Sequence, residues 1–326
     1  RFAWRLPRLW LQEHPESGII MKSVLITGCS TGIGRALAIE FHERGCRVLA
    51  TARKVEAIED LKALGMTTAA VDVTQPSSLK AAIASFGGHV DIVVANAGMA
   101  GFSPLVEADL STVQGIFQTN VVGVIATVQA ATPSMMERGS GLVVVIGSVS
   151  GVLVTPYAGA YCASKAAVAA CCTSFRMELE PFGIGVLHVM TGAVRSQFAD
   201  NAIAESSLPV DSRYAVLQPY IEARTVASQG PQSMEAAAYA RDVVHAALAE
   251  TVPDELVAGG SARKYLWTGK FTPAAMLKAS LQKTFGLDTL QTAATRKAST
   301  SGGFCGLFSS VSSDAGSSDA GSEAEN

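Results

Sequence analysis

Residues 22–44 read KSVLITGCSTGIGRALAIEFHER, an apolar run that passes through three glycines into a pattern typical of a helix. We expect a strand over Ser23–Thr27, a turn over Thr27–Gly34 and a helix over Ile33–Arg44. Glycines between a strand and a helix let the backbone approach a pyrophosphate, which the positive end of the helix attracts. The stretch therefore predicts an α/β fold with a phosphate-binding turn at its first strand. The candidate contact residues of this turn are Gly28, Ser30, Thr31, Gly32, Ile33 and Gly34.

The same alternation of short apolar runs and helical patterns continues beyond the turn. We expect further strands over Arg47–Ala50, Thr68–Val71, Ile92–Ala95, Leu142–Ile146 and Gly185–Val189. Between them we expect helices over Val55–Ala63, Ser77–Phe86, Leu110–Met136 and Ala160–Glu180. Strands this apolar favour a parallel sheet covered by helices on both faces. The predicted fold class is a single doubly wound, Rossmann-like α/β domain with ligands at the carboxyl ends of its strands.

The two ends of the chain differ in composition from this core. Residues 1–20 precede Met21 and are expected to form an extension outside the fold. Because Arg1, Arg5 and Arg8 lie in this segment, the remnant of a targeting peptide is the alternative. Toward the other end the chain becomes rich in serine and glycine, which predicts a disordered tail over residues 291–326. The predicted catalytic domain therefore spans residues 21–290.

Charge and composition exclude several classes of function. The formal net charge is -3 and 16% of the residues are charged, without a long Lys/Arg stripe, so no nucleic-acid partner is expected. No apolar run approaches the roughly 18 residues that suggest a membrane span. The histidines and cysteines lack the spacing of metal ligands, so no metal site is expected. The six cysteines are expected to be reduced thiols.

The end of the second strand bears on the choice of cofactor. Proteins that bind NAD usually place Asp or Glu here, where it accepts hydrogen bonds from the ribose 2′-hydroxyl. This chain has Ala52 followed by Arg53, whose guanidinium can bind a 2′-phosphate through charge-assisted hydrogen bonds. We therefore predict NADP(H) as the cofactor. The alternative is a solvated Arg53 with the cofactor preference set elsewhere.

Three polar residues follow a spacing that suits proton transfer. Ser148 comes after the fifth expected strand, Tyr161 lies 13 residues later and Lys165 four residues beyond. A spacing of four places Tyr161 and Lys165 side by side on a helix, although a lone Y-x-x-x-K also occurs on solvated helix faces. Because a tyrosine with a pKa near ~10 is a poor proton relay at neutral pH, we expect Lys165 to lower the pKa of Tyr161. Ser148 is expected to hold the substrate oxygen.

The T-G-x-x-x-G-x-G spacing of residues 27–34, the N-A-G of residues 96–98 and the Ser148, Tyr161 and Lys165 set resemble the short-chain dehydrogenase/reductase family. The resemblance covers most of residues 22–200 and implies an enzyme that interconverts a carbonyl and a secondary alcohol. It also implies that Tyr161 and Lys165 contact the cofactor and that Asn120 is a fourth catalytic residue, which holds a water in the proton path. The further cofactor contacts that it implies are Asp72, Val73, Asn96, Ala97, Gly98, Val194 and Ser196.

The chain departs from the family after the sixth expected strand, where Thr191 replaces a proline and Ser196 replaces a threonine that fixes the nicotinamide amide. A serine hydroxyl keeps both the donor and the acceptor of threonine, so the role of Ser196 is expected to survive.

Several shorter stretches resemble one branch of the family, the 1-acyldihydroxyacetone-phosphate reductases. They are residues 29–31, 52–54, 164–167, 177–183, 191–192 and 285–288. This resemblance implies an NADPH-dependent reduction of the ketone of an acylated dihydroxyacetone phosphate, in lipid synthesis. Hydroxysteroid and retinol dehydrogenases are similar and stand as the alternative. A non-catalytic NADP(H)-sensing protein is a third possibility, against which the complete set of Asn120, Ser148, Tyr161 and Lys165 speaks.

The segment after Ser196 is where the family builds a substrate lid. Its apolar residues either form walls for a long or bulky ligand or pack the lid onto the core: Phe198, Leu208, Tyr214, Leu217, Tyr220 and Ile221. Cations available for a substrate phosphate are Arg195, Arg213, Arg224, Arg263 and Lys264, and the sequence singles out none of them.

The expected helices over residues 110–136 and 160–180 correspond to those that form dimer faces in the family. Ala166, Ala167, Ala169 and Ala170 permit close approach of a second copy, so a homodimer or homotetramer is expected. With translation from Met21 we expect a cytoplasmic protein, peripheral at the endoplasmic reticulum or at lipid droplets because the implied substrate is lipid-like. If residues 1–20 end a longer leader, an organelle is the alternative.

Overall fold

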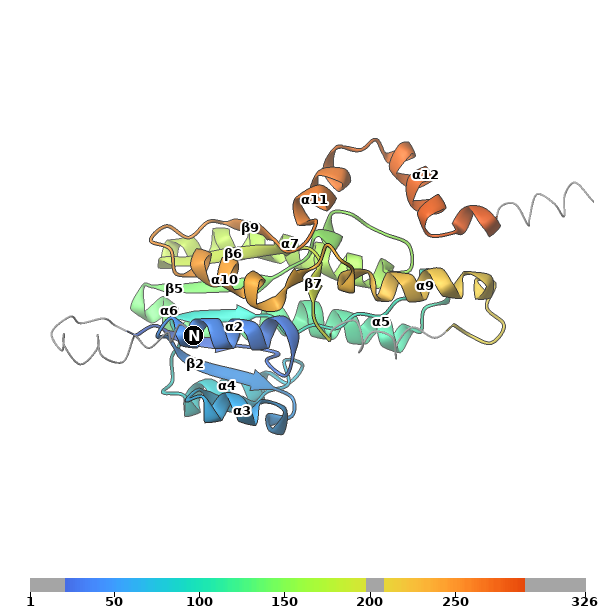
Figure 1. Cartoon of the computed structure of the whole chain (residues 1–326). Helices are drawn as coiled ribbons and strands as arrows, with labels where there is room; N and C mark the ends of the chain where they lie inside the picture. The colour runs from blue at the N-terminus through green and yellow to red at the C-terminus, as the bar shows by residue number, and fades with distance from the viewer. Residues whose placement is uncertain (1–20, 198–207, 291–326) are drawn as a thin grey trace, which may run out of the picture. The chain divides into compact units, whose positions relative to one another are not determined.

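The computed structural model describes residues 21–197 and 208–290, and within them seven strands form one parallel sheet (Figure 1). The strands are β1 (Ser23–Ile26), β2 (Arg47–Ala52), β3 (Thr67–Ala70), β4 (Ile92–Ala95), β5 (Gly141–Ile146), β6 (Ile184–Thr191) and β9 (Glu255–Ala258). Their order in the sheet is β3-β2-β1-β4-β5-β6-β9. Successive strands are therefore added in one direction from β1 to β3 and in the opposite direction from β4 to β9. The switch point between β1 and β4 is where such folds open a crevice for ligands.

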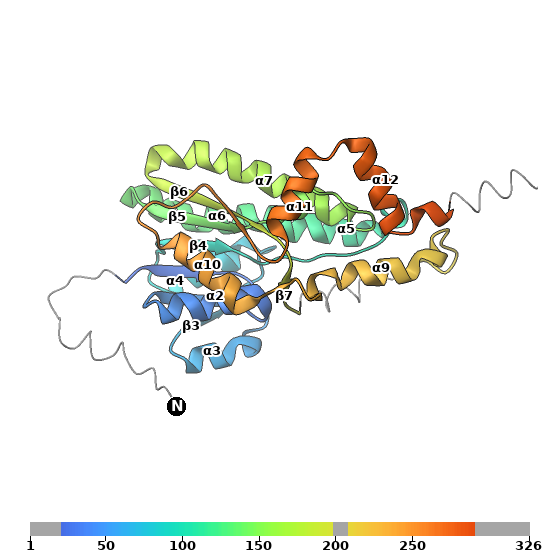
Figure 2. The same ribbon diagram turned by 45° about the horizontal axis from the view of Figure 1, so that its top comes forward.

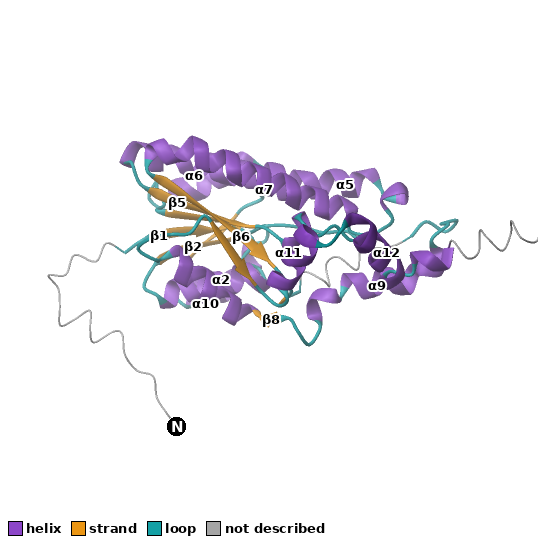
Figure 3. Ribbon diagram, turned by 90° about the horizontal axis from the view of Figure 1, so that it is seen from above, coloured by secondary structure: helices purple, strands orange, loops and turns teal. Residues whose placement is uncertain are grey.

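Helices cover both faces of the sheet, as Figure 3 shows from above. One core lies under α2 (Gly32–Glu43), α3 (Glu59–Ala63) and α10 (Ala236–Ala247). The other lies under α4 (Pro76–Ser85), α6 (Gly123–Arg138) and α7 (Gly159–Leu179). Successive strand residues alternate between the two cores: Val24 and Ile26 face one of them, and Leu25 faces the other. This explains why the central strands are apolar without interruption.

The remaining elements gather at the end of the sheet to which the strands point (Figure 2). They include α5 (Leu110–Phe117), α9 (Gln218–Thr225), α11 (Ala262–Phe271) and α12 (Ala274–Thr284). A short parallel pair, β7 (Val194–Arg195) with β8 (Met234–Glu235), fixes the chain after β6. The compact unit ends at Phe285, and Gly286–Leu290 belong to a second unit.

The predicted doubly wound parallel sheet is confirmed, and all six expected strands are present within one or two residues. The seventh strand, β9, and the helix before it, α10, were not predicted. The expected helix over Leu110–Met136 is interrupted at η3 (Gln118–Val122), a π-helical turn between α5 and α6. The extension over residues 1–20 and the tail over residues 291–326 lie outside the described residues.

Candidate active site

The glycine-rich turn approaches the end of β4 so closely that side chains are excluded. Gly28 and Gly32 have φ values of +75° and +57°, which favour glycine. A Cβ at Gly34 would collide with the Gly28 carbonyl oxygen and with the Asn96 amide. The Asn96 amide donates to the carbonyl oxygens of Thr27 and Gly28 at 2.8 and 3.2 Å. Asn96 therefore holds the turn in place.

A cavity of about 690 Å³ begins at this turn and runs along the carboxyl ends of the strands. Every residue predicted from the sequence for the site lines it, with the exception of Asn120. The predicted residues that line it are Gly28, Ser30, Thr31, Gly32, Ile33, Gly34, Arg53, Asp72, Val73, Asn96, Ala97, Gly98, Ser148, Tyr161, Lys165, Val194 and Ser196.

The turn end of the cavity suits a phosphorylated dinucleotide. Helix α2 begins at Gly32, and its N-cap residue Thr31 makes no side-chain capping bond, so the amide groups of the first turn are available to an anion. Arg53 is exposed in this part of the cavity and forms no ion pair with a described carboxylate. The Asp72 carboxylate is occupied by Thr74, whose amide and hydroxyl donate to it at 2.9 and 2.7 Å.

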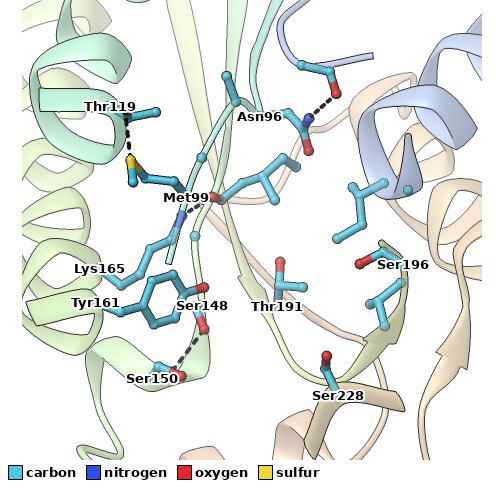
Figure 4. Close-up of a pocket in the computed structure, with 18 of the residues that line it drawn as sticks. Asn96, Met99, Thr119, Ser148, Ser150, Tyr161, Lys165, Thr191, Ser196 and Ser228 are labelled. Carbon is cyan, nitrogen blue, oxygen red and sulfur yellow. Dashed lines mark hydrogen bonds between the residues drawn. The ribbon is translucent and has the colours of Figure 1, made fainter. Parts of the chain in front are cut away.

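The polar groups for proton transfer lie on one wall of the same cavity (Figure 4). Ser148 follows β5, and its Oγ accepts the Ser150 amide at 3.1 Å and forms a hydrogen bond with Tyr161. The Lys165 Nζ donates to the Ile146 carbonyl oxygen at 3.1 Å and lies 5.8 Å from the centroid of the Tyr161 ring. Thr191, Ser196 and Ser228 face this wall from the other side of the cavity.

The pKa of Tyr161 lies above its ordinary value, and not below it as the position of Lys165 had led us to expect. Burial raises the pKa of Tyr161, and the groups that lower it in part are the Ser148 hydroxyl and the charge of Arg224. Burial also lowers the pKa of Lys165 to about 8, because the same low-dielectric surroundings disfavour an ammonium as much as a phenolate. A raised pKa keeps Tyr161 protonated at neutral pH, which suits a proton donor.

Asn120 lies in the π-helical turn η3 and is fully buried behind the cavity wall. Its Oδ1 accepts the Met99 amide at 2.9 Å. Its Nδ2 donates to the Met99 carbonyl oxygen at 2.9 Å and to the Ser164 hydroxyl at 3.0 Å. The side chain therefore ties the segment after β4 to α7, and both of its donor hydrogens are used in doing so.

The lid contributes differently from what its apolar residues suggested. Of the apolar lid residues named from the sequence, Leu217 and Ile221 are fully buried, and Phe198 lies outside the described residues. None of the described ones lines the cavity, which favours their role in packing the lid onto the core. The lid residue beside the proton-transfer wall is instead Arg224. The spacing Leu217, Ile221, Arg224 follows one face of a helix and is a signal that the sequence contained. The apolar wall comes from Phe102, Leu153, Tyr265, Leu281 and Phe285, and of these five Phe285 alone lies in a stretch that the family resemblance had marked.

The family model of the short chain dehydrogenases matches residues 22–207. The chain therefore belongs to the short-chain dehydrogenase family and is an oxidoreductase that acts on CH–OH and C=O groups.

Relatives of known sequence and structure agree with this. Short-chain dehydrogenase PC-15 of Penicillium crustosum is 39% identical over 229 residues, which are 68% of this chain and 83% of that protein. The NADPH-dependent 1-acyldihydroxyacetone phosphate reductase of Schizosaccharomyces pombe is 36% identical over 201 residues, 59% of this chain and 68% of the reductase. The crystal structure of a short-chain dehydrogenase from Streptomyces avermitilis superimposes with a TM-score of 0.68 at 29% identity, covering 87% of this chain and 98% of that one.

The described residues lack two further features. In residues 21–197 and 208–290, no group of three or more His, Cys, Asp or Glu side chains is placed to hold a metal ion. None of the helices in these ranges combines the length and the apolar character needed to cross a membrane.

Lys165 is expected to cost the folded state stability at neutral pH. Its folded pKa of about 8 lies below its ordinary value, so between the two the unfolded chain binds more protons and stability rises with pH. Below that window the full penalty, roughly 3 kcal/mol, is present. Lys165→Met removes it but leaves the Ile146 carbonyl oxygen without this donor, at a cost of about 1–3 kcal/mol. We predict that, without NADP(H), the free energy of unfolding of the variant equals or exceeds that of the parent at pH 7. As the pH rises from about 8 to 10, the free energy of unfolding of the parent should increase relative to that of the variant.

Urea unfolding at several pH values measures this difference. Lys62→Met, at an exposed position on α3, serves as the control and should show no such pH trend. A constant loss of stability in Lys165→Met at every pH would mean that the ammonium is not desolvated in the folded protein.

Proposed function

We propose that the protein is an NADP(H)-dependent carbonyl reductase in which Tyr161 donates the proton. The observation that carries this proposal is that Ser148, Tyr161 and Lys165 line the same cavity as the glycine-rich turn and Arg53. The turn and Arg53 would hold the phosphate groups of a dinucleotide in the cavity that these three side chains also line. When bound, NADPH supplies a hydride to the carbonyl carbon.

The chain's own residues manage the carbonyl oxygen. Ser148 and Tyr161, which are hydrogen-bonded to each other, hold the oxygen and direct the carbonyl carbon toward the cofactor side of the cavity. As negative charge develops on the oxygen, Tyr161 passes its proton to it and becomes a phenolate. Lys165, 5.8 Å from the ring, stabilises that phenolate while its ammonium is protonated. Asn120 acts as a positioning residue, since its amide holds the Met99 segment against α7.

The substrate that we propose is the ketone of an acylated dihydroxyacetone phosphate. The apolar wall formed by Phe102, Leu153, Tyr265, Leu281 and Phe285 suits an acyl chain. The 36% sequence identity with the Schizosaccharomyces pombe reductase, whose name gives this substrate, supports the same substrate class. A steroid or a retinoid is the alternative, because an apolar wall alone does not separate these ligands from an acyl chain.

The first test is NADPH oxidation by the purified protein with 1-acyldihydroxyacetone phosphate. We expect steady turnover with NADPH, much weaker turnover with NADH, and a loss of about 100-fold or more in kcat for Tyr161→Phe. Tyr220→Phe removes the same hydroxyl from an exposed residue on α9 and should retain the parent activity.

Other outcomes separate the alternatives. Turnover of steroids or retinoids without turnover of the acyl ketone would replace the substrate class and keep the reductase. NADPH-dependent binding of a partner that persists in Tyr161→Phe, with no turnover of any ketone by the parent, would point to the non-catalytic function.

We also propose a homodimer or homotetramer formed through α5, η3 and α7. Leu110, Val122 and Met177 expose 73%, 44% and 67% of their surface. Ala166 and Ala170 are also exposed, and both lie on α7. Light scattering at micromolar concentration should give at least twice the chain mass. Ala170→Arg should reduce this to the mass of one chain, whereas Ala84→Arg on the exposed face of α4 should not. A single-chain mass for the parent would refute the proposal.

The lipid-like substrate leads us to propose a cytoplasmic protein that works at a membrane surface through α11 and α12. Trp267, Phe271 and Met276 each expose more than 60% of their surface there. Residues 262–285 contain five Lys and Arg residues and no acid, which favours an anionic lipid surface.

Flotation with vesicles that contain phosphatidylserine tests this location. We expect the parent to float with the vesicles at low salt and to be released by salt. Trp267→Ala should weaken the binding, whereas Leu64→Ala, which removes an equally exposed apolar group next to α3, should not. Equal flotation of both variants and the parent would reject this surface.

A further inference from the structure

Arg224 lies at the proton-transfer end of the cavity, on the last turn of α9. Its Nε donates to the Thr155 hydroxyl at 2.9 Å. Its guanidinium carbon lies 5.0 Å from the centroid of the Phe102 ring. These two contacts hold the planar group and leave its terminal amino groups without a hydrogen bond to any described residue.

The charge of Arg224 has no counter-charge in the described part of the chain. Burial lowers the pKa of the guanidinium, and the groups that interact with it electrostatically are Cys162, Tyr161 and Tyr265, which are neutral at pH 7. Five of the ten other arginines among the described residues are paired with a carboxylate. These pairs are Arg35–Asp60, Arg44–Glu40, Arg138–Asp91, Arg176–Asp254 and Arg195–Glu235.

Arg224 is partly buried and lines the cavity, so a ligand anion that enters there would give its charge a partner. A guanidinium is well suited to this, since its two terminal amino groups can bind two oxygens of one phosphate or carboxylate side by side. The charge of Arg224 also lowers the pKa of Tyr161, so the two groups are close enough to interact. An anion on Arg224 would therefore lie near the carbonyl held by Tyr161.

We infer that Arg224 is the specificity residue that binds an oxyanion of the substrate, a phosphate ester or a carboxylate only a few atoms from the reacting carbonyl. The inference rests on the proposed reductase function and deepens it. A neutral sterol or retinoid would leave Arg224 unpaired, so the inference disfavours that alternative. It also distinguishes Arg224 from the exposed cations of the lid, because Arg195 is already paired with Glu235 at 2.6 Å.

The test compares ketones that differ only in charge. Parent, Arg224→Gln and Arg224→Lys are assayed with NADPH on 1-acyldihydroxyacetone phosphate and on the same acylated ketone without its phosphate, each at its own pH optimum. We expect the parent to prefer the phosphorylated ketone in kcat/KM, and this preference to fall by about 100-fold in Arg224→Gln, mainly through KM. Arg224→Lys should restore part of the preference. Arg213→Gln, at an exposed position before α9, is the matched control and should keep it.

A binding measurement separates failure of this inference from failure of the reductase proposal. Calorimetric titration with lysophosphatidate should give an affinity at least about 10-fold lower for Arg224→Gln than for the parent, whether or not any ketone turns over. Equal affinities, or an equal loss of activity on the charged and neutral ketones, would overturn the role of Arg224. A 4-oxo fatty acid identifies the source of the oxyanion, because a preference for it over its methyl ester, lost in Arg224→Gln, would assign a carboxylate. Turnover of no ketone, with lysophosphatidate binding that depends on Arg224, would overturn the reductase function and keep the anion site.

Discussion

The close approach of the β1–α2 turn to the end of β4 is the contact on which the rest of the site depends. Asn96 binds the carbonyl oxygens of Thr27 and Gly28, and Gly34 leaves no room for a side chain between them. The contact extends along the chain, because the segment after Asn96 continues to Met99, whose amide and carbonyl groups are both bound by Asn120. Asn120 in turn donates to Ser164, which lies between Tyr161 and Lys165 on α7. These hydrogen bonds and the backbone of residues 96–99 thus link the glycine-rich turn to α7 and set the distance between them.

Burial sets the electrostatics at the other end of that chain. The same desolvation raises the pKa of Tyr161, lowers that of Lys165 to about 8 and lowers that of Arg224. All three shifts disfavour the charged form of the group, although Lys165, with a pKa of about 8, is still mostly protonated at neutral pH. This arrangement suits reduction, in which a neutral phenol gives up its proton only as negative charge appears on the substrate oxygen. The two cations that lie nearest then stabilise the phenolate that is left.

Whether an element or a site residue could be predicted from the sequence depends on the physical constraint that acts on it. The glycine turn was predictable because its backbone geometry requires glycine. Asn96 and the Ser148, Tyr161 and Lys165 set were predicted from the resemblance to the family, with the helical spacing of Tyr161 and Lys165 in agreement. The π-helical turn at Gln118–Val122 was not predictable, since its residues are compatible with a continuous α-helix. The short strand β9, with half-buried Leu256 and Val257, lacks the uninterrupted apolar character of β5. The sign of the Tyr161 shift was missed because spacing shows which groups are neighbours and does not show how little water surrounds them.

The residues at the substrate end of the cavity could not be predicted from the sequence either. No close backbone contact constrains α9, α11 and α12 to particular residue types, so their side chains are free to set specificity. Leu217 and Ile221 serve packing, and the apolar wall of Phe102, Leu153 and Phe285 accepts many hydrocarbon shapes. Shape therefore selects weakly in this cavity, whereas the charge of the partly buried Arg224 guanidinium can separate anionic from neutral ligands. Of the residues that reach the reacting end, Arg224 carries such a charge without a described carboxylate beside it. For the proposed substrate, discrimination between an anionic and a neutral ketone would thus depend on electrostatics before it depends on the fit of the acyl chain.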